Sequence, residues 1–356
     1  MAGLTDPAAP APPRPQPPAA QPGGGALPDR LVRRTLLVVL FGAAVFAAVL
    51  LAADGPRVAE ALAAFDWRLL PLAVAFTLWN YLIRWLKWQY FLRIVGVEVS
   101  LGESLAVFLS GMGMAITPGK VGELLKAYLL RQLRGTPVSV TAPIVVAERL
   151  TDGLAMVVLA LGGIASVRGG PQALAAFVIP ALALILLVRW RRGAAHALRL
   201  ATRLPLLSAR AEQLQAFYES AYHLLGLRAL LVTVSLGVAS WFGECVALYV
   251  ILAGLGLAPG SALLLQSTFA MATSTLVGTF SMLPGGLGLA EASLFGLLAL
   301  FVPGISRQQS AAATMLFRLV TFWMGIALGL GTLGLVLQRI GTRPTGTPAH
   351  YAPRDA

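Results

Sequence analysis

The sequence predicts an all-α polytopic membrane protein with two inverted repeats, each containing a broken, re-entrant helical hairpin. Three observations lead to this prediction. Of the 356 residues, 57% are hydrophobic and only 12% are charged, too few to cover the surface of a soluble domain of this size. The apolar residues form several runs long enough to cross a bilayer. Two further runs are interrupted by the same pattern, Pro-Gly-x-x-Gly, at 118–122 and 284–288.

The composition also excludes several classes of site and partner. The formal net charge is +12, but the basic residues gather at the ends of apolar runs, as in cytoplasmic loops that face anionic lipid, so nucleic acid is not an expected partner. One cysteine, Cys245, excludes an internal disulfide and a cysteine-based metal cluster. The three histidines lie far apart, which disfavours a histidine metal site. We therefore expect no metal and no cofactor.

The N-terminal segment is predicted to be disordered and cytoplasmic over 1–34. Its first 29 residues are mainly Pro, Ala and Gly, and a basic group of three arginines follows. An apolar run at about 35–53 is interpreted as a retained first span, because a cleaved signal peptide lies closer to the start and has a shorter core. The transmembrane domain is expected at 35–340, and a disordered tail at 341–356.

The first repeat is predicted at 69–167, after a connector at 54–68 that we place outside the membrane. Its parts are a span at about 69–91, a hairpin of two short pieces at 105–117 and 121–131, and a span at 141–167. Arg84, Lys87 and Arg93 place the end of the first span toward the cytoplasm. Both pieces of the hairpin are short for a hydrocarbon core of about 30 Å, so we expect it to enter and leave on the cytoplasmic side.

The second repeat is predicted at 229–337. Its parts are a span at about 229–255, a broken pair at 262–283 and 287–302, and a span at 311–337. A span at 172–190 and an interfacial helix at 193–227 separate the repeats. Because one span lies between them, the two repeats enter the membrane from opposite sides. This is the plan of secondary transporters, whose broken helices meet near the midplane around the substrate.

The order of charged residues supports the repeat. Arg149 lies 26 residues after Glu123, and Arg318 lies 27 residues after Glu291. The alternative is that Pro-Gly recurs by chance in an apolar sequence rich in glycine.

The first break is a candidate site for an anion. A half-helix that begins after Pro118 and Gly119 would direct its free N–H groups at the cavity, and Lys120 would add a positive charge that suits a phosphate. Glu123 would cap that helix, pair with a neighbouring lysine or carry a coupling proton. The alternative is a hairpin anchored at the headgroup level. The candidate residues here are Pro118, Gly119, Lys120, Gly122, Glu123 and Lys126.

The second break has no lysine. Its glycines leave bare backbone, and an intramembrane carboxylate such as Glu291 needs a partner or water. Arg318 is the expected partner, either in a working site or in a pair that only ties two helices together. The candidate residues here are Pro284, Gly285, Gly286, Gly288, Glu291 and Arg318.

A third group of candidates is Glu148, Arg149 and Asp152, in which the two carboxylates share a helical face. Without a metal scaffold or a nucleophile–histidine arrangement, we expect them to pair with the basic residues of the first hairpin rather than to catalyse a reaction. Arg84 and Glu244 each lie about 15 residues into the first span of their repeat, so they could be equivalent positions of the two repeats. The alternative is that the side chain of Arg84 simply extends to the membrane interface.

Three ordered motifs, TPGKVGELLKAYLL at 117–130, AERLTDG at 147–153 and LPGGLGLAE at 283–291, resemble the lysylphosphatidylglycerol synthase transmembrane family. The family includes the flippase half of the multiple peptide resistance factor and stand-alone relatives linked to hopanoid or polyprenyl-sugar export. The resemblance covers about 35–340 and implies that a lipid is moved between leaflets. Because the chain ends soon after its last span, we expect a stand-alone member without a soluble synthase domain.

The expected function is that of an inner-membrane lipid translocator, not an enzyme, for an anionic or phosphate-bearing lipid. Three alternatives remain open at this point. The first is a secondary transporter of small solutes on the same repeat, and the second is an intramembrane enzyme for a polyprenyl-linked substrate. The third is a membrane scaffold, whose partner would be a lipid synthase or a glycosyltransferase.

Overall fold

The computed structural model describes residues 29–117, 122–161 and 211–341, together with a few single positions between the last two ranges. Several sequence-based predictions therefore lie outside the described residues. They are the predicted disordered segments apart from residues 29–34 and 341, most of the span at 172–190, the first part of the interfacial helix, and Pro118, Gly119 and Lys120. Residues 29–34 were predicted to be disordered but belong to a helix that begins at Asp29.

The described chain is helical and contains no strand. Its helices are α1 (Asp29–Ala52), α2 (Gly55–Ala63), α3 (Leu70–Ile94), α4 (Leu101–Gly113), α5 (Leu125–Arg134), α6 (Val138–Leu161), α10 (Ala211–Leu224), α11 (Leu227–Gly254), α12 (Ser261–Phe280), α13 (Leu289–Phe301), α14 (Arg307–Arg318) and α15 (Met324–Gly341). Short turns supplement them, namely the 3₁₀ turns η1 (Trp67–Leu69), η2 (Met114–Ile116) and η5 (Pro284–Gly286) and the π-helical turn η6 (Leu319–Trp323).

Within the described residues, five helical segments are long and apolar enough to cross a membrane. They are Trp67–Ile94, Leu227–Gly254, Ser261–Phe280, Pro284–Phe301 and Arg307–Ile340. A sixth candidate is the pair of α1 and α2, which is bent by 97°. The prediction of an all-α, multi-pass membrane protein is confirmed.

The structure corrects two predicted boundaries. The connector at 54–68 contains the helix α2, because Val58 is fully buried and packs in one cluster with Ala53 and Phe65. The last span starts at Arg307 instead of 311. Ser306 accepts a hydrogen bond from the backbone N–H of Gln309, whose side chain accepts one from Ser306 in return, so a reciprocal cap fixes the earlier start.

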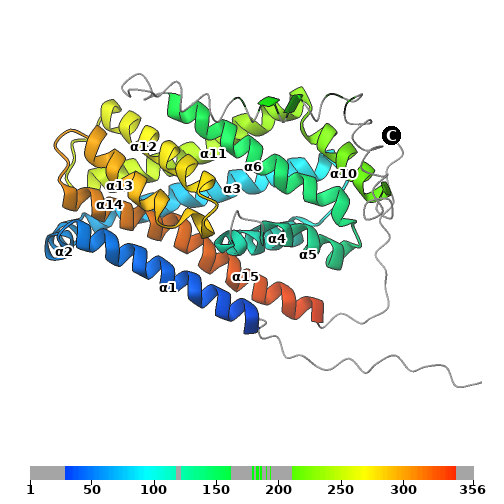
Figure 1. Ribbon diagram of the computed structural model, residues 1–356, viewed down its shortest axis with the longest axis horizontal. Coiled ribbons are helices and arrows are strands. Elements are labelled where there is room, and N and C mark those ends of the chain that lie inside the picture. Colours follow the sequence, from blue (N-terminus) through cyan, green and yellow to red (C-terminus); the bar gives the residue numbers. More distant parts are fainter. Residues whose placement is uncertain are drawn as a thin grey trace, which may run out of the picture.

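The two broken hairpins pack at opposite ends of the molecule. Figure 1 shows α4 and α5 at the end away from α2, and α12 and α13 at the end where α2 lies. Two hydrophobic clusters agree with this view, since one joins α2 to α12, α13 and α14, and the other joins α4 and α5 to α10 and the end of α15. The turns η2 and η5, one at each break, contact each other between the clusters. The inverted symmetry of the two halves stays a prediction.

The close crossing of α4 and α15 holds the first hairpin against the second half. A Cβ atom added to Gly329 would lie 2.2 Å from the backbone nitrogen of Gly113 and 2.6 Å from the carbonyl oxygen of Leu109. Real Cβ atoms do not approach backbone so closely, so both glycines are required for this crossing.

We expect Gly329→Ala to lower the free energy of unfolding by about 1–3 kcal/mol, because the two helices would have to separate. Gly331→Ala is the matched control, since a Cβ there meets nothing within 4 Å in the same helix. Denaturant titration of the two variants in detergent micelles measures the difference. Equal stability of the two variants would contradict the close crossing.

Candidate functional site

A cavity lined by both polar and apolar side chains lies between the two halves and reaches both breaks. The volume in which the centre of a water molecule can lie is about 110 Å³. Since roughly 10–15 Å³ suffices for one water, the cavity is large enough for several. Its charged lining residues are Arg84, Glu123, Glu244 and Arg318, and its polar ones include Tyr81, Ser274, Thr275, Thr279 and Thr321. The backbone of Gly285 and Gly286 from the second break completes the wall.

Beside the first break, six charged side chains form one continuous chain of ion pairs. Glu148 pairs with Lys126, whose Nζ also lies 3.9 Å from Glu123. Arg149 continues the chain, with Nη2 3.3 Å from Glu123 and 3.1 Å from Asp152. Asp152 in turn accepts a hydrogen bond from Lys87. Three cations and three carboxylates leave this cluster, here called the ion chain, with no net formal charge.

The ion chain joins three helices. Lys87 comes from α3, Lys126 from α5, and the other side chains from α6 or from the turn before α5. Lys126 and Glu148 are each 2% exposed. Buried charges of this kind persist only in pairs or networks, because an isolated charge in a low-dielectric interior is very costly. The ion chain therefore fixes the position of the first hairpin against α3 and α6.

The second break is built around Glu291, which is fully buried. One carboxylate oxygen accepts the backbone N–H of Gly288 at 2.7 Å, and the other accepts the Nε–H of Arg318 at 2.5 Å. Arg318 also donates to the carbonyl oxygen of Gly285 at 3.3 Å. Gly285 adopts φ = 62°, and a Cβ there would lie 2.2 Å from the ring of Phe322. Only glycine fits this position.

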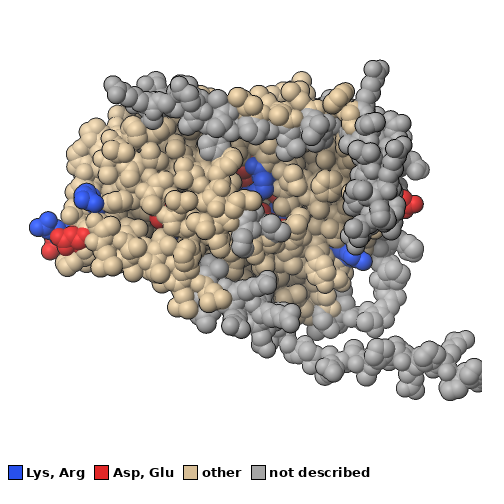
Figure 2. Space-filling view, viewed as in Figure 1, with Lys and Arg blue, Asp and Glu red and all other residues tan. Residues whose placement is uncertain are grey.

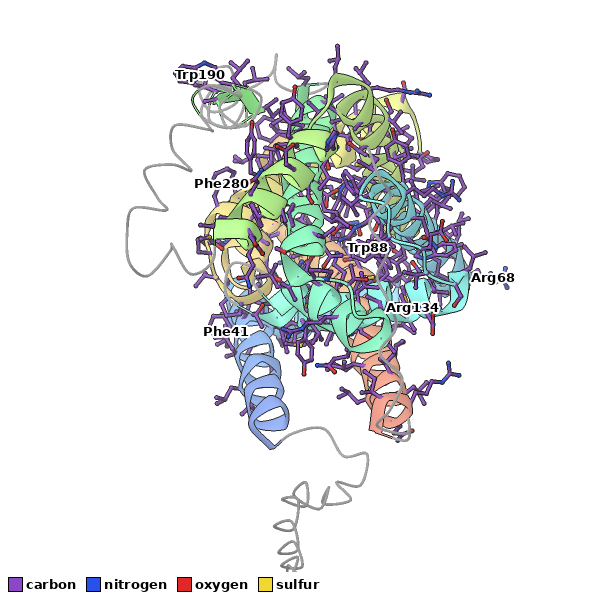
Figure 3. All side chains as sticks on the ribbon, turned by 90° about the vertical axis from the view of Figure 1, so that its right-hand side faces the viewer. Phe41, Arg68, Trp88, Arg134, Trp190 and Phe280 are labelled. Atoms are coloured by element: carbon purple, nitrogen blue, oxygen red, sulfur yellow. The ribbon has the colours of Figure 1, made fainter. Side chains whose placement is uncertain are left out.

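Aromatic rings face the cations of the site. Lys126 Nζ lies 4.7 Å from the ring centre of Trp88, and the guanidinium carbon of Arg318 lies 4.2 Å from that of Phe322. Arg84 faces Trp241 at 5.1 Å. Figure 3 shows Trp88 among the helices, whereas Arg68 at the rim points away from them. Each ring supports the cation electrostatically without neutralising it.

On the face shown in Figure 2, basic and acidic atoms gather near the centre of a largely uncharged middle region, with one small acidic spot beside them and other charges near the ends. An uncharged middle region is what contact with the hydrocarbon core of a bilayer requires, and the charged atoms near its centre mark the polar interior.

The structure brings most of the predicted site residues together, but in two separate clusters. Glu123, Lys126, Glu148, Arg149 and Asp152 belong to the ion chain, and the backbone N–H of Gly122 beside it donates to the hydroxyl of Thr117 at 2.7 Å. Pro284, Gly285, Gly286, Gly288, Glu291 and Arg318 form the second break. Of the predicted residues that the structure describes, only Glu123, Gly285, Gly286 and Arg318 line the cavity.

Two predicted pairings are confirmed and one is corrected. Glu291 pairs with Arg318, and Glu148 pairs with Lys126 of the first hairpin. Asp152 pairs with Lys87 of α3 and not with the hairpin. Lys87 is 1% exposed, so it does not mark the cytoplasmic end of its span.

Lys87 was not identified from the sequence as a site residue, because a lysine near the end of an apolar run is common. The one available signal was that Asp152 needs a cation as its partner. Arg84 and Glu244 were noticed only for their similar positions in α3 and α11. The structure places both on the wall of the same cavity, so Arg84 does not extend to the interface.

Comparison with known proteins gives one family. A sequence profile for the lysylphosphatidylglycerol synthase TM region matches residues 36–329. Two relatives from Methanothermobacter thermautotrophicus, each named UPF0104 membrane protein, are 27% and 26% identical over 310 and 324 residues. The two alignments cover 77% and 83% of this chain and 86% and 94% of the relatives.

We expect Glu148→Gln to lower the free energy of unfolding by about 3–5 kcal/mol, because it leaves the buried Lys126 with a weaker, distant partner. The control is Glu103→Gln, which removes a carboxylate from the partly exposed pair with Arg134 and should cost at most about 1 kcal/mol. Adding Lys126→Met to Glu148→Gln should restore part of the loss. Denaturant titration in detergent micelles compares the variants, and equal losses at Glu148 and Glu103 would contradict the ion chain.

Proposed function

The chain belongs to the lysylphosphatidylglycerol synthase TM-region family, and from this membership and the cavity we propose that it is a lipid translocator of the inner membrane. It moves a phosphate-bearing lipid between leaflets. The name of the family refers to an enzyme that makes a membrane lipid, which agrees with a lipid substrate. The relatives are named only as membrane proteins.

One observation carries the proposal. A cavity with charged residues in its wall lies where two helix breaks meet, inside a protein whose spans are largely apolar. Irregular backbone and charged side chains at membrane depth are tolerated where they line a polar cavity, and such cavities are the substrate sites of transporters. A polar headgroup occupies the cavity while the acyl chains stay in the bilayer.

The ion pairs supply a means of changing state. Glu123 lies between two cations, Lys126 and Arg149, and it is the member of the ion chain that reaches the cavity. When a headgroup enters, Glu123 shifts from one cation to the other, and the first hairpin moves relative to α6. The exchange costs little, because each cation keeps a second carboxylate, Glu148 or Asp152.

We propose no catalytic role for Glu148 and Asp152. Each carboxylate is held by at least one buried cation, and neither residue lines the cavity. A general base must reach its substrate, so these two carboxylates are suited to support the hairpin and not to catalyse a reaction.

The proposed orientation places the N-terminus in the cytoplasm. The end of the molecule that holds the first hairpin carries the basic ends of α3, α5 and α15, with Arg93, Arg131 and Arg339. Cytoplasmic loops carry such an excess of lysine and arginine. The second hairpin then opens from the external side.

The proposal is tested by leaflet movement of labelled lipids in proteoliposomes. The panel contains phosphatidylglycerol, an aminoacylated lipid, a hopanoid and a polyprenyl-phospho-sugar. We expect wild type to move one class and Glu123→Gln to slow it about tenfold or more, because the shared carboxylate is lost. Glu103→Gln is the matched control and should transport normally.

Movement of no class by folded wild-type protein would overturn the proposal and favour a scaffold for a lipid synthase or glycosyltransferase. A chemically altered lipid would favour an enzyme, and uptake of a water-soluble solute would favour a small-solute transporter.

The orientation is tested by thiol labelling of intact spheroplasts with a membrane-impermeant reagent. Arg68 precedes α3, and Gln132 lies near Leu133, which packs with the far end of that helix. The 25 residues of α3 place the two sites roughly 37 Å apart along its axis. We expect Arg68→Cys to be labelled and Gln132→Cys to be labelled only after lysis. The native Cys245 is buried and gives little background. The reverse pattern would invert the topology.

A further inference from the structure

One wall of the cavity is formed by α3 and α11. Arg84 lies on this wall with its guanidinium carbon 5.1 Å from the ring centre of Trp241 and 6.0 Å from that of Phe108. A guanidinium that stacks on a ring keeps its charge, and the N–H groups on its edge remain available to an acceptor.

Arg84 differs from the other cations of the site. Lys87, Lys126, Arg149 and Arg318 each have a carboxylate oxygen within 4.0 Å. Among the residues that the structure describes, no carboxylate lies within this distance of Arg84, and its guanidinium makes no hydrogen bond to them. The positive charge of Arg84 therefore faces the cavity with donors to spare.

Trp241 gives a second, independent indication. The residue is only 7% exposed, it lines the same cavity, and its indole Nε1–H has no acceptor within the described part of the chain. A buried donor without an acceptor is costly, and an oxygen of a ligand that reached the indole N–H would satisfy it.

We propose that Arg84 and the indole N–H of Trp241 form a subsite for the phosphate of the headgroup, apart from both helix breaks. Phosphate has several acceptor oxygens, so it can take a forked pair of N–H groups from arginine and a third from the indole at once. This inference rests on the proposed function, because it identifies the group by which the cavity holds its lipid.

Glu244 supplies the opposing charge of the subsite. It follows Trp241 by three residues on α11 and lines the same cavity, so it lies on the same face of the helix. A carboxylate there repels a phosphate and competes for Arg84. The phosphate is thereby bound weakly enough to leave, which a transporter requires and a tight binding site does not.

The test measures binding to the purified full chain in detergent by titration calorimetry. The ligand is short-chain phosphatidylglycerol, and short-chain diacylglycerol is the control without a phosphate. We expect Arg84→Gln to raise the Kd about tenfold to a hundredfold, the range of charge-assisted hydrogen bonds. Trp241→Phe, which keeps the ring and loses the N–H, should raise it about fivefold. Glu244→Gln should lower it.

Two variants serve as matched controls. Arg68→Gln removes an exposed arginine outside the cavity. Trp79→Phe removes an indole N–H that already donates to the carbonyl oxygen of Ala239 at 3.2 Å. Both should bind as wild type does. Arg84→Lys keeps the charge but loses the planar fork, so it should fall between wild type and Arg84→Gln.

The outcomes separate this inference from the proposed function. Unchanged binding in folded Arg84→Gln or Arg84→Lys, or equal binding of diacylglycerol, would overturn the subsite. Transport of lipid by wild type would still stand. If inorganic phosphate binds with the same dependence on Arg84 but the lipid does not, the subsite stands, its ligand is a soluble ion, and the lipid function fails. Displacement of the lipid by inorganic phosphate supports both.

Discussion

A charge that is shielded from water inside a membrane protein must be matched by an opposite charge in contact with it, and the ion chain is how this molecule meets that constraint. The ion chain contains three carboxylates and three cations, which come from α3, α6 and the first hairpin. Carboxylates and cations alternate along it, so every member is paired with an opposite charge. Removing Lys126 would leave Glu148 without its cation, and removing Asp152 would leave Lys87 without its carboxylate, where water cannot solvate the remaining charge. The ion chain therefore positions the first hairpin against α3 and α6, while the close crossing of α4 and α15 holds it against the second half.

The same constraint shapes the cavity. The ion chain is neutral as a whole, and Glu291 with Arg318 is neutral at the second break. The charges of the cavity wall that lie outside these two clusters are Arg84 and Glu244, of opposite sign. In the proposed function, a wall of this kind attracts a charged headgroup at one point without holding it strongly overall. The two breaks then act as supports, and α3 with α11 provides the proposed surface for the ligand.

Part of the fold and of the site follows from local sequence. Hydropathy alone gives the all-α, multi-pass class, and the two Pro-Gly-x-x-Gly patterns give the positions of the breaks. Glu291 and Arg318 were predictable as partners because each is a lone charge in apolar surroundings. In contrast, Lys87 lies near the end of a run, where a lysine can extend to the interface, so nothing local reveals that it is buried against Asp152. Hydropathy misses the helix α2 because its nine residues are too short for a span, although one of its faces is apolar.

The sequence by itself determined which segments are apolar, where the chain breaks and which ionisable residues are too deep to remain unpaired, because these properties depend on residues close in the chain. Only the tertiary structure decided which cation meets which carboxylate and which charges reach the cavity. The reason is physical. The ion chain joins α3 to α6 across about 60 residues, and the close approach of Gly113 to Gly329 spans more than 200. Such pairings depend on how whole helices pack, and a local pattern does not contain that information.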